Sequence, residues 1–352
     1  MPYAARARAH AGGLIDMSIG TPVDPTPRVA REALASAADA PGYPATYGTP
    51  ELRDAVAQWF ARRRGVPDVD PAGVLPTIGS KEMVAWLPTL LGLGPGDRVV
   101  HPQVAYPSYD VGARLAGATP VPADGTLQLG PAARNVALIW LNSPANPTGR
   151  VLGVEHLAKV VDWARSNGAV VASDECYAEL GWDVGDVPSL LDPRVCGGSH
   201  EGLLAMYSTS KQSNLAGYRA GFVAGDPVLV AELLEVRKHA GMMMPAPVQS
   251  ALTAVLGDDA HVAEQKERYR ARRELARKAF TDAGFRIDHS EAGLYLWLTR
   301  EEPCWDSVAW LADRGILVAP GAFYGAAGAQ HVRAALTVPD AAAAALADRL
   351  TP

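Results

Sequence analysis

Short, continuous apolar runs alternate with longer helical patterns in the middle of the chain, and this alternation constrains the fold more than any other feature. The apolar runs lie at 98–101, 136–141, 169–172 and 203–207, bounded by Gly, Pro, Asn or Asp. Helical patterns cover 81–93, 109–116 and 154–167. Strands that are apolar throughout are buried on both faces, which is typical of a parallel sheet between layers of helices. The sequence therefore predicts an α/β fold with a mostly parallel central sheet.

The last third of the chain has a different pattern. A charge-rich helix is predicted at 258–283, strands at 292–298, 315–319 and 331–337, and helices at 306–314 and 341–350. This order indicates a smaller α+β module. The segment 14–26 is too short for a domain and too apolar for a tail, so we expect it to pack on that module. The predicted domains are a large one at 31–260 and a small one formed by 1–30 and 261–352.

Composition excludes several classes of function. The net charge of −6 argues against nucleic acid or an anionic membrane as the main partner. No apolar run approaches the roughly 20 residues that span a bilayer. The cysteines (Cys176, Cys196 and Cys304) are far apart and odd in number, so they predict neither a disulfide framework nor a metal site. We expect a cytoplasmic protein without a bound metal.

Candidate site residues follow the predicted strands, because ligands of such sheets bind beyond the carboxyl ends of the strands. Gly79 and Ser80 open a helix, where free N–H groups and a hydroxyl suit a phosphate. Alternatively, Ser80 is an ordinary N-cap. Tyr106 follows the run at 98–101 and can stack on a flat ligand, unless it is only a half-buried surface residue.

The next two strand ends carry an amide and a carboxyl group. Asn146 follows the run at 136–141, in a proline-rich stretch that alternatively is a plain loop. Asp174 follows 169–172 directly, and a buried carboxylate is costly without a cationic partner. A protonated pyridine is such a partner, whereas in the competing interpretation Asp174 only caps the next element.

Lys211 follows the last apolar run and has Ser208, Ser210 and Arg219 nearby in the sequence. A lysine that forms a Schiff base has to be neutral part of the time, which partial burial favours. Serine hydroxyls and one guanidinium suit a phosphate. In the alternative interpretation Lys211 is a solvated loop residue. Phosphate donors, a stacking ring, an amide, an anion and an amine at successive strand ends are together what pyridoxal phosphate requires.

Three motifs carry a family resemblance: SPANPTG at 143–149, SDECYAEL at 173–180 and STSKQSNLAGYRAGF at 208–222. The chain resembles the class I and II aminotransferases, pyridoxal-phosphate enzymes of fold type I, from Gly20 to Arg333. The resemblance implies that Lys211 is the Schiff-base lysine and that Asp174 pairs with the pyridine nitrogen. It implies that Asn146 and Tyr177 donate to the phenolic oxygen of the cofactor. The residues that it implies for cofactor binding are Tyr43, Gly79, Ser80, Lys81, Tyr106, Asn146, Asp174, Tyr177, Ser208, Ser210, Lys211 and Arg219, of which Lys211, Asp174 and Tyr177 are expected to be catalytic.

The resemblance also implies a substrate site and a dimer. Arg333 is similar to the arginine that binds the substrate α-carboxylate and Gly20 to a glycine near that carboxylate. Asn146 is also expected to bind the substrate. Tyr43 resembles the tyrosine that reaches the cofactor phosphate of the neighbouring subunit, with Tyr47 as the competing choice. A homodimer with shared active sites is therefore expected.

The finer resemblance is to short bacterial succinyldiaminopimelate aminotransferases of lysine and cell-wall precursor synthesis. It rests on stretches such as PGYPATYGTPELRDAV at 41–56 and AYPSYDVGARLAGA at 105–118. Glutamate is the implied amino donor, and Lys81, Arg28 and Arg150 are the candidate cations for the distal carboxylates.

Other functions stay open at this point. The enzyme can instead be an aminotransferase for another amino acid, such as aspartate or an aromatic amino acid. A lyase that cleaves a C–S bond on the same fold shares the cofactor motifs. A sensor without enzymatic activity, like the aminotransferase-like modules of some transcription regulators, is the third alternative.

Overall fold

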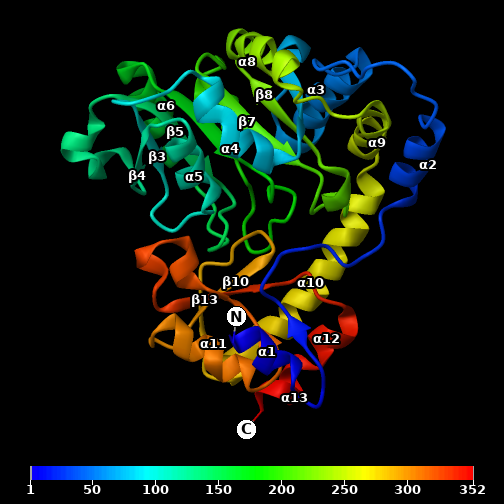
Figure 1. Ribbon diagram of the computed structural model, residues 1–352, viewed down its shortest axis with the longest axis vertical. Helices are drawn as coiled ribbons and strands as arrows, with labels where there is room; N and C mark the ends of the chain where they lie inside the picture. The colour runs from blue at the N-terminus through cyan, green and yellow to red at the C-terminus, as the bar shows by residue number, and fades with distance from the viewer. Residues whose placement is uncertain (1, 352) are drawn as a thin grey trace.

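The computed structural model describes residues 2–351, which form two lobes, one above the other in Figure 1. Within these residues the upper lobe holds a seven-stranded sheet in the order β2-β8-β7-β6-β5-β3-β4. The strands are β2 (Val74–Ile78), β3 (Arg98–His101), β4 (Thr119–Pro122), β5 (Val136–Asn142), β6 (Val170–Asp174), β7 (Leu203–Ser208) and β8 (Ala220–Gly225). Strand β8 runs antiparallel to both neighbours, and the other pairs are parallel. The predicted fold class is confirmed.

Helices cover both faces of this sheet. One layer consists of α4 (Ser80–Leu90), α5 (Ser108–Leu115) and α8 (Pro227–Ala240), and the other of α3 (Pro50–Arg64), α6 (Val154–Asn167) and α9 (Ala246–Leu256), with α2 (Arg28–Ser36) against α9. In β7, Leu204 and Met206 pack on the first layer, whereas Leu203 and Tyr207 pack on the second. Alternate residues of the strand thus enter two cores, which explains why it is apolar throughout.

The lower lobe is built by both ends of the chain. Its sheet has the order β12-β13-β10-β9, with β9 (Arg286–Asp288), β10 (Tyr295–Thr299), β12 (Ala319–Pro320) and β13 (His331–Ala335). Its helices are α1 (Pro2–Arg8), α11 (Cys304–Ala312), α12 (Asp340–Ala344) and α13 (Leu346–Leu350). Helix α10 (Asp259–Asp282) runs down from the upper lobe into the lower one (Figure 1). The domain boundaries at residues 30 and 260 stay a prediction.

The N-terminal segment pairs with this lobe, as its apolar residues predict. Strand β1 (Ile15–Asp16) is parallel to β11 (Ile316–Leu317), and the amide of Ala335 donates to the carbonyl of Met17 at 2.8 Å. This pairing brings residues 18–21 to the boundary between the lobes.

Several predicted boundaries were wrong in detail. The helix predicted at 341–350 is broken at Ala345 into α12 and α13, and the strand predicted at 315–319 is the two short strands β11 and β12. The helix predicted at 81–93 begins at Ser80 and ends at Leu90, with Pro88 inside it. Across residues 2–351 no helix combines the length and apolarity needed to cross a membrane.

Candidate active site

The carboxyl ends of β2, β3, β5, β6 and β7 lie at one edge of the upper sheet, and the antiparallel strand β8 begins there. A cavity of about 620 Å³ opens at this edge, between the two lobes. The predicted site residues that line it are Gly20, Ser80, Lys81, Tyr106, Asn146, Asp174, Tyr177, Ser208, Ser210, Lys211, Arg219 and Arg333. They come from segments that are up to 313 residues apart, from 20 to 333.

Asp174, the last residue of β6, lies on the cavity wall and is only 7% exposed. Its Oδ2 accepts a hydrogen bond from the hydroxyl of Tyr109 at 3.0 Å, and its Oδ1 accepts from the amide of Cys176 at 3.2 Å. Within residues 2–351 it has no ion-pair partner, and burial raises its pKa. The contact with Cys176 shows that the capping interpretation also holds, but it leaves the charge of the carboxylate uncompensated.

Lys211 lies beyond the end of β7 and is half-buried. Its Nζ donates to the carbonyl oxygen of Gly20, so the N-terminal segment contacts the lysine directly. A Cβ at Gly20 would lie 2.4 Å from the hydroxyl of Tyr295, so a larger residue there would force the Tyr295 ring to move.

One end of the cavity is rich in hydrogen-bond donors. The Oγ atoms of Ser208 and Ser210 are 2.8 Å apart, and Ser80 begins α4. Gly79, with φ 70° and ψ 161°, is the residue that caps α4, so the alternative of a Ser80 N-cap was wrong. Arg219 donates to the carbonyl of Ala216 at 3.0 Å and has no carboxylate partner within the described residues. A guanidinium, hydroxyls and a helix N-terminus together suit a phosphate.

Arg333 lies on β13 in the lower lobe and is 6% exposed. Its Nη1 donates to Oδ1 of Asn146 at 3.0 Å and its Nη2 to the carbonyl of Ser18 at 2.7 Å. Its Nε is buried and, among residues 2–351, has no hydrogen-bond partner. The guanidinium also lies 4.1 Å from the ring centroid of Tyr295. Within residues 2–351 it is a fixed, buried cation without an ion-pair partner, as a carboxylate site requires.

Tyr177 packs edge-on against Tyr295, and their hydroxyls are 3.0 Å apart. Burial raises the pKa of Tyr177 well above its usual value, so the phenol stays protonated and can donate a hydrogen bond. The Nδ2 of Asn146 has no partner within the described chain, and its backbone amide is held by Oδ1 of Asn142 at 2.7 Å. The Nδ2 of Asn146 is therefore an unused donor, and the Tyr177 hydroxyl is a second one when Tyr295 is the donor of their hydrogen bond. Both residues line the same cavity as Asp174 and Lys211.

Several residues of this site were missed in the sequence. Tyr109, three residues after Tyr106 and in the first turn of α5, is fully buried, and its hydroxyl donates to Asp174. Helical spacing does not link the two tyrosines, because Tyr106 precedes α5. The aromatic wall formed by Tyr3, Trp305 and Phe323 gave no signal, because it joins distant segments. The rings of Tyr3 and Trp305 stack at 5.7 Å, and Phe323 meets Trp305 edge-on at 5.7 Å.

Four residues predicted for this site do not line the cavity of their own chain: Gly79, Tyr43, Arg28 and Arg150. Tyr43 is 97% exposed, while the hydroxyl of its competitor Tyr47 donates to the carbonyl of Ala72 at 2.9 Å. Arg28 pairs with Glu32 on the surface of α2. Arg150 lines a separate cavity of about 240 Å³, so Lys81 is the remaining candidate for a distal carboxylate.

Comparisons with known proteins identify the family. The family model described as aminotransferase class I and II matches residues 13–350. The chain belongs to this family. It is 60% identical to the 4-dedimethylamino-4-oxo-anhydrotetracycline transaminase OxyQ of Streptomyces rimosus, over 100% of this chain and 97% of that protein. It is 62% identical to a probable aminotransferase of Mycobacterium tuberculosis, over 99% of this chain and 82% of that protein.

Solved structures agree with this assignment. The N-succinyldiaminopimelate aminotransferase of M. tuberculosis superposes with a TM-score of 0.86 at 27% identity, covering 99% of this chain and 95% of that one. The protein is therefore an aminotransferase that depends on pyridoxal phosphate.

The cavity fits this cofactor in two respects. The carboxyl group of Asp174 is buried without a cation, and a protonated pyridine nitrogen supplies one. At the other end, a Cβ on Gly79 would lie 2.3 Å from Nη2 of Arg219, so the absence of a side chain leaves the guanidinium free to face a phosphate. No group of His, Cys, Asp or Glu in the part of the chain that the structure describes could hold a metal ion.

Proposed function

We propose that this aminotransferase transfers the amino group of glutamate to N-succinyl-2-amino-6-oxopimelate, a step of lysine and diaminopimelate biosynthesis. The observation that carries the proposal is that two cations, Arg333 and Lys81, line the same largely apolar cavity as Lys211. Arg333 suits the α-carboxylate, and the Lys81 ammonium forms no ion pair within residues 2–351 and suits a distal carboxylate. The likeness to the M. tuberculosis structure over nearly the whole chain supports this choice.

In this proposal five side chains hold the cofactor ring. Lys211 is the covalent attachment site and Asp174 pairs with the ring nitrogen. Tyr106 stacks on the ring, and Asn146 and Tyr177 donate to its phenolic oxygen. The phosphate is bound by Ser80, Ser208, Ser210 and Arg219, beside Gly79 and Lys81. The support is geometric: apart from Gly79, each of these residues lines one cavity, and the donors and the anion have no competing partner of opposite charge.

The reaction then follows from what these residues do. When bound, pyridoxal phosphate supplies an electron-accepting ring that stabilises negative charge at the substrate Cα. Asp174 holds the proton on the ring nitrogen. Arg333 fixes the α-carboxylate, which orients the Cα–H bond toward the Nζ of Lys211. The Nζ accepts that proton as general base and later returns it as general acid. The apolar walls exclude water from the proton transfer.

An aromatic oxo acid or ketone is the second candidate substrate. The wall of Tyr3, Trp305 and Phe323 lines the cavity and presents ring faces that suit a flat substrate. The S. rimosus relative is named for a 4-oxo-anhydrotetracycline substrate.

The experiment that tests the proposal is a half-reaction assay on the purified holoenzyme. Glutamate is expected to abolish the visible absorption of the bound cofactor, and N-succinyl-2-amino-6-oxopimelate to restore it faster than phenylpyruvate does. Lys81→Met is expected to raise the KM of the succinylated substrate by about tenfold or more, since a charge-assisted hydrogen bond contributes about 1.5–3 kcal/mol. Faster recovery with phenylpyruvate, lost in Trp305→Ala, would favour the aromatic candidate. Pyruvate released from cystathionine without an oxo acid would favour the lyase.

We also propose a homodimer with shared active sites, in which Tyr43 reaches the cofactor phosphate of the neighbouring subunit. The support is its 97% exposure, since a tyrosine without contacts in its own subunit is available to another one. Mixing Tyr43→Ala with Lys211→Ala tests this. If sites are shared, one site of a hybrid dimer combines Lys211 of the first variant with Tyr43 of the second and carries neither change, so activity reappears on mixing. If sites are not shared, every site carries one of the two changes and activity does not reappear. The cytoplasm remains the proposed compartment, consistent with three unpaired cysteines.

A further inference from the structure

Two adjacent buried carboxylates, Asp174 and Glu175, lie at the end of strand β6 and have different environments. Asp174 lines the active-site cavity, but Glu175, only 2% exposed, stays outside it. The next two residues, Cys176 and Tyr177, line the cavity again. Glu175 therefore does not contact the cavity. The other residues of the same turn, Asp174, Cys176 and Tyr177, form part of the cavity wall.

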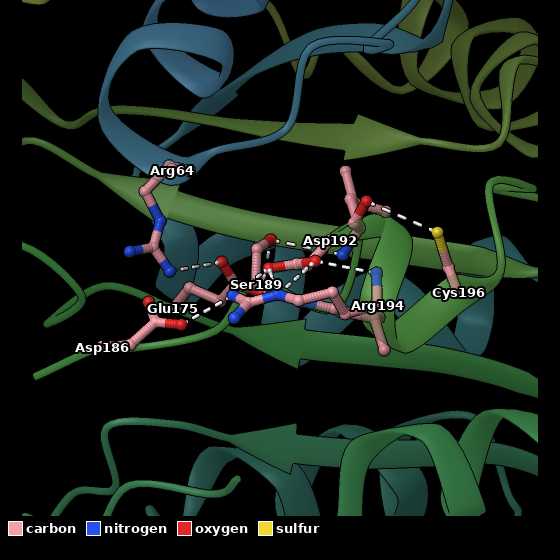
Figure 2. A network of polar contacts seen from close by, with 9 residues as sticks. Arg64, Glu175, Asp186, Ser189, Asp192, Arg194 and Cys196 are labelled. Carbon is pink, nitrogen blue, oxygen red and sulfur yellow. Dashed lines mark hydrogen bonds and ion pairs between the residues drawn. The ribbon is translucent and has the colours of Figure 1, made fainter. Parts of the chain in front are cut away.

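Glu175 is held by three hydrogen bonds, and Figure 2 shows two of the partners, Arg64 and Ser189, beside it. Its Oε1 accepts from the amide of Leu190 at 2.7 Å and from the hydroxyl of Ser189 at 3.1 Å. Its Oε2 accepts from Nη2 of Arg64 at 3.3 Å. The side chain of Arg64 is 4% exposed, so this is a buried ion pair. Burial raises the pKa of Glu175, and the charge of Arg64 opposes that shift.

The backbone of Glu175 ties the same turn to the strand that leads to the lysine. Its amide donates to the carbonyl of Met206 on β7 at 2.9 Å. Two residues later β7 ends at Ser208, and Lys211 follows. A displacement of Glu175 would therefore change the position of Asp174 relative to Lys211.

We propose that Arg64 and Glu175 are positioning residues, whose ion pair holds the 174–177 turn in the place where Asp174 meets the cofactor ring opposite Lys211. This inference rests on the roles of Asp174 and Lys211 proposed above. A buried ion pair contributes little net stability compared with apolar residues of similar size, whereas its directed hydrogen bonds set one geometry. The position of a reacting group has a large effect on the reaction rate, because a displacement of about 1 Å can lower the rate about a hundredfold.

The last turn of α3 offers a matched control. Arg63, the neighbour of Arg64, pairs with Glu179 at 2.5 Å. Glu179 belongs to the same segment as Glu175 and is also buried, but it follows the cavity-lining turn and does not line the cavity. Glu179→Gln therefore disturbs the contact between α3 and this segment without acting on Asp174.

The test compares the double variant Arg64→Met/Glu175→Gln with Glu179→Gln, both as holoenzymes. The double change removes both buried charges together, so it avoids an unpaired ion and allows folding. We expect the pH titration of the bound cofactor's visible absorption to shift in the double variant, and kcat to fall about tenfold at an unchanged KM for glutamate. In Glu179→Gln both are expected to stay as in the wild type.

An unchanged titration and kcat in the double variant would overturn the inference, and so would equal changes in both variants. Wild-type protein serves to separate the two proposals. If glutamate converts the wild-type cofactor and the variants do not differ from it, only the positioning role fails. If glutamate leaves the wild-type spectrum unchanged, the proposed function fails first.

Discussion

The substitution Gly79→Ala tests the phosphate end of the cavity by one added methyl group. Gly79 joins β2 to α4 with φ 70° and ψ 161°, a region that is almost restricted to glycine. The new Cβ would lie 2.3 Å from Nη2 and 2.7 Å from Cζ of Arg219. Arg219 is exposed and its Nη1 is bonded to the carbonyl of Ala216, so any shift of the guanidinium disturbs that hydrogen bond. The guanidinium or the loop around it has to move.

The expected cost has two separable parts. Placing an alanine in this backbone conformation destabilises the folded protein by about 1–3 kcal/mol, with or without cofactor. If Arg219 binds the phosphate as proposed, its displacement additionally costs a charge-assisted hydrogen bond, which contributes about 1.5–3 kcal/mol. Because each 1.4 kcal/mol is about tenfold in affinity, cofactor binding should weaken about tenfold to a hundredfold.

The assay is a titration of the apoprotein with pyridoxal phosphate, followed by absorption, alongside urea unfolding of the apoprotein. Gly168→Ala is the control, since Gly168 caps α6 with φ 67° and a Cβ there meets no atom within 4 Å. It should lower stability by about 1 kcal/mol and leave cofactor affinity unchanged. Wild-type cofactor affinity in Gly79→Ala would refute the assignment of Arg219 to the phosphate.

Three further outcomes are expected. Lys211→Ala should abolish transamination and leave the circular dichroism spectrum of the fold intact; residual full activity would contradict the assignment of the lysine. Arg333→Lys should lower kcat/KM for glutamate about tenfold to a hundredfold, because a point charge replaces a planar pair of donors, and steady-state kinetics measure this. Asp288 has its pKa lowered from 3.8 to about 2, chiefly by a hydrogen bond from Arg286. Its ionised form therefore stabilises the fold above pH 3.8, and this contribution is lost as the pH falls through about 2. Urea unfolding of Asp288→Asn should show a loss of about 1 kcal/mol or less at neutral pH, because exposed pairs are screened. This difference should shrink between pH 3.8 and about pH 2 and vanish at lower pH.

The regular elements of the upper lobe could be predicted well because their signals are local. The strands β3, β5, β6 and β7 each form a short apolar run between breakers, and α6 has the predicted bounds. Strands β2, β4 and β8 were not predicted as members of the sheet. Strand β8 is interrupted by glycines, and its antiparallel direction depends on its neighbours. In the lower lobe, the break between α12 and α13 falls in an alanine-rich run that has no local signal for it.

The sequence by itself predicted the candidate cofactor residues that follow the strands, from Ser80 to Arg219, and in the structure they line one cavity. The physical reason is that parallel strands bring their carboxyl ends to one edge, so a local motif after each strand is enough to predict a shared site. Only the tertiary structure decided which distant segments complete it. The carbonyl of Gly20 at Lys211, the wall of Tyr3, Trp305 and Phe323, and the pair of Arg64 with Glu175 join residues up to 320 positions apart, from 3 to 323. Such contacts arise from the packing of two lobes and three layers, which no local pattern of residues encodes.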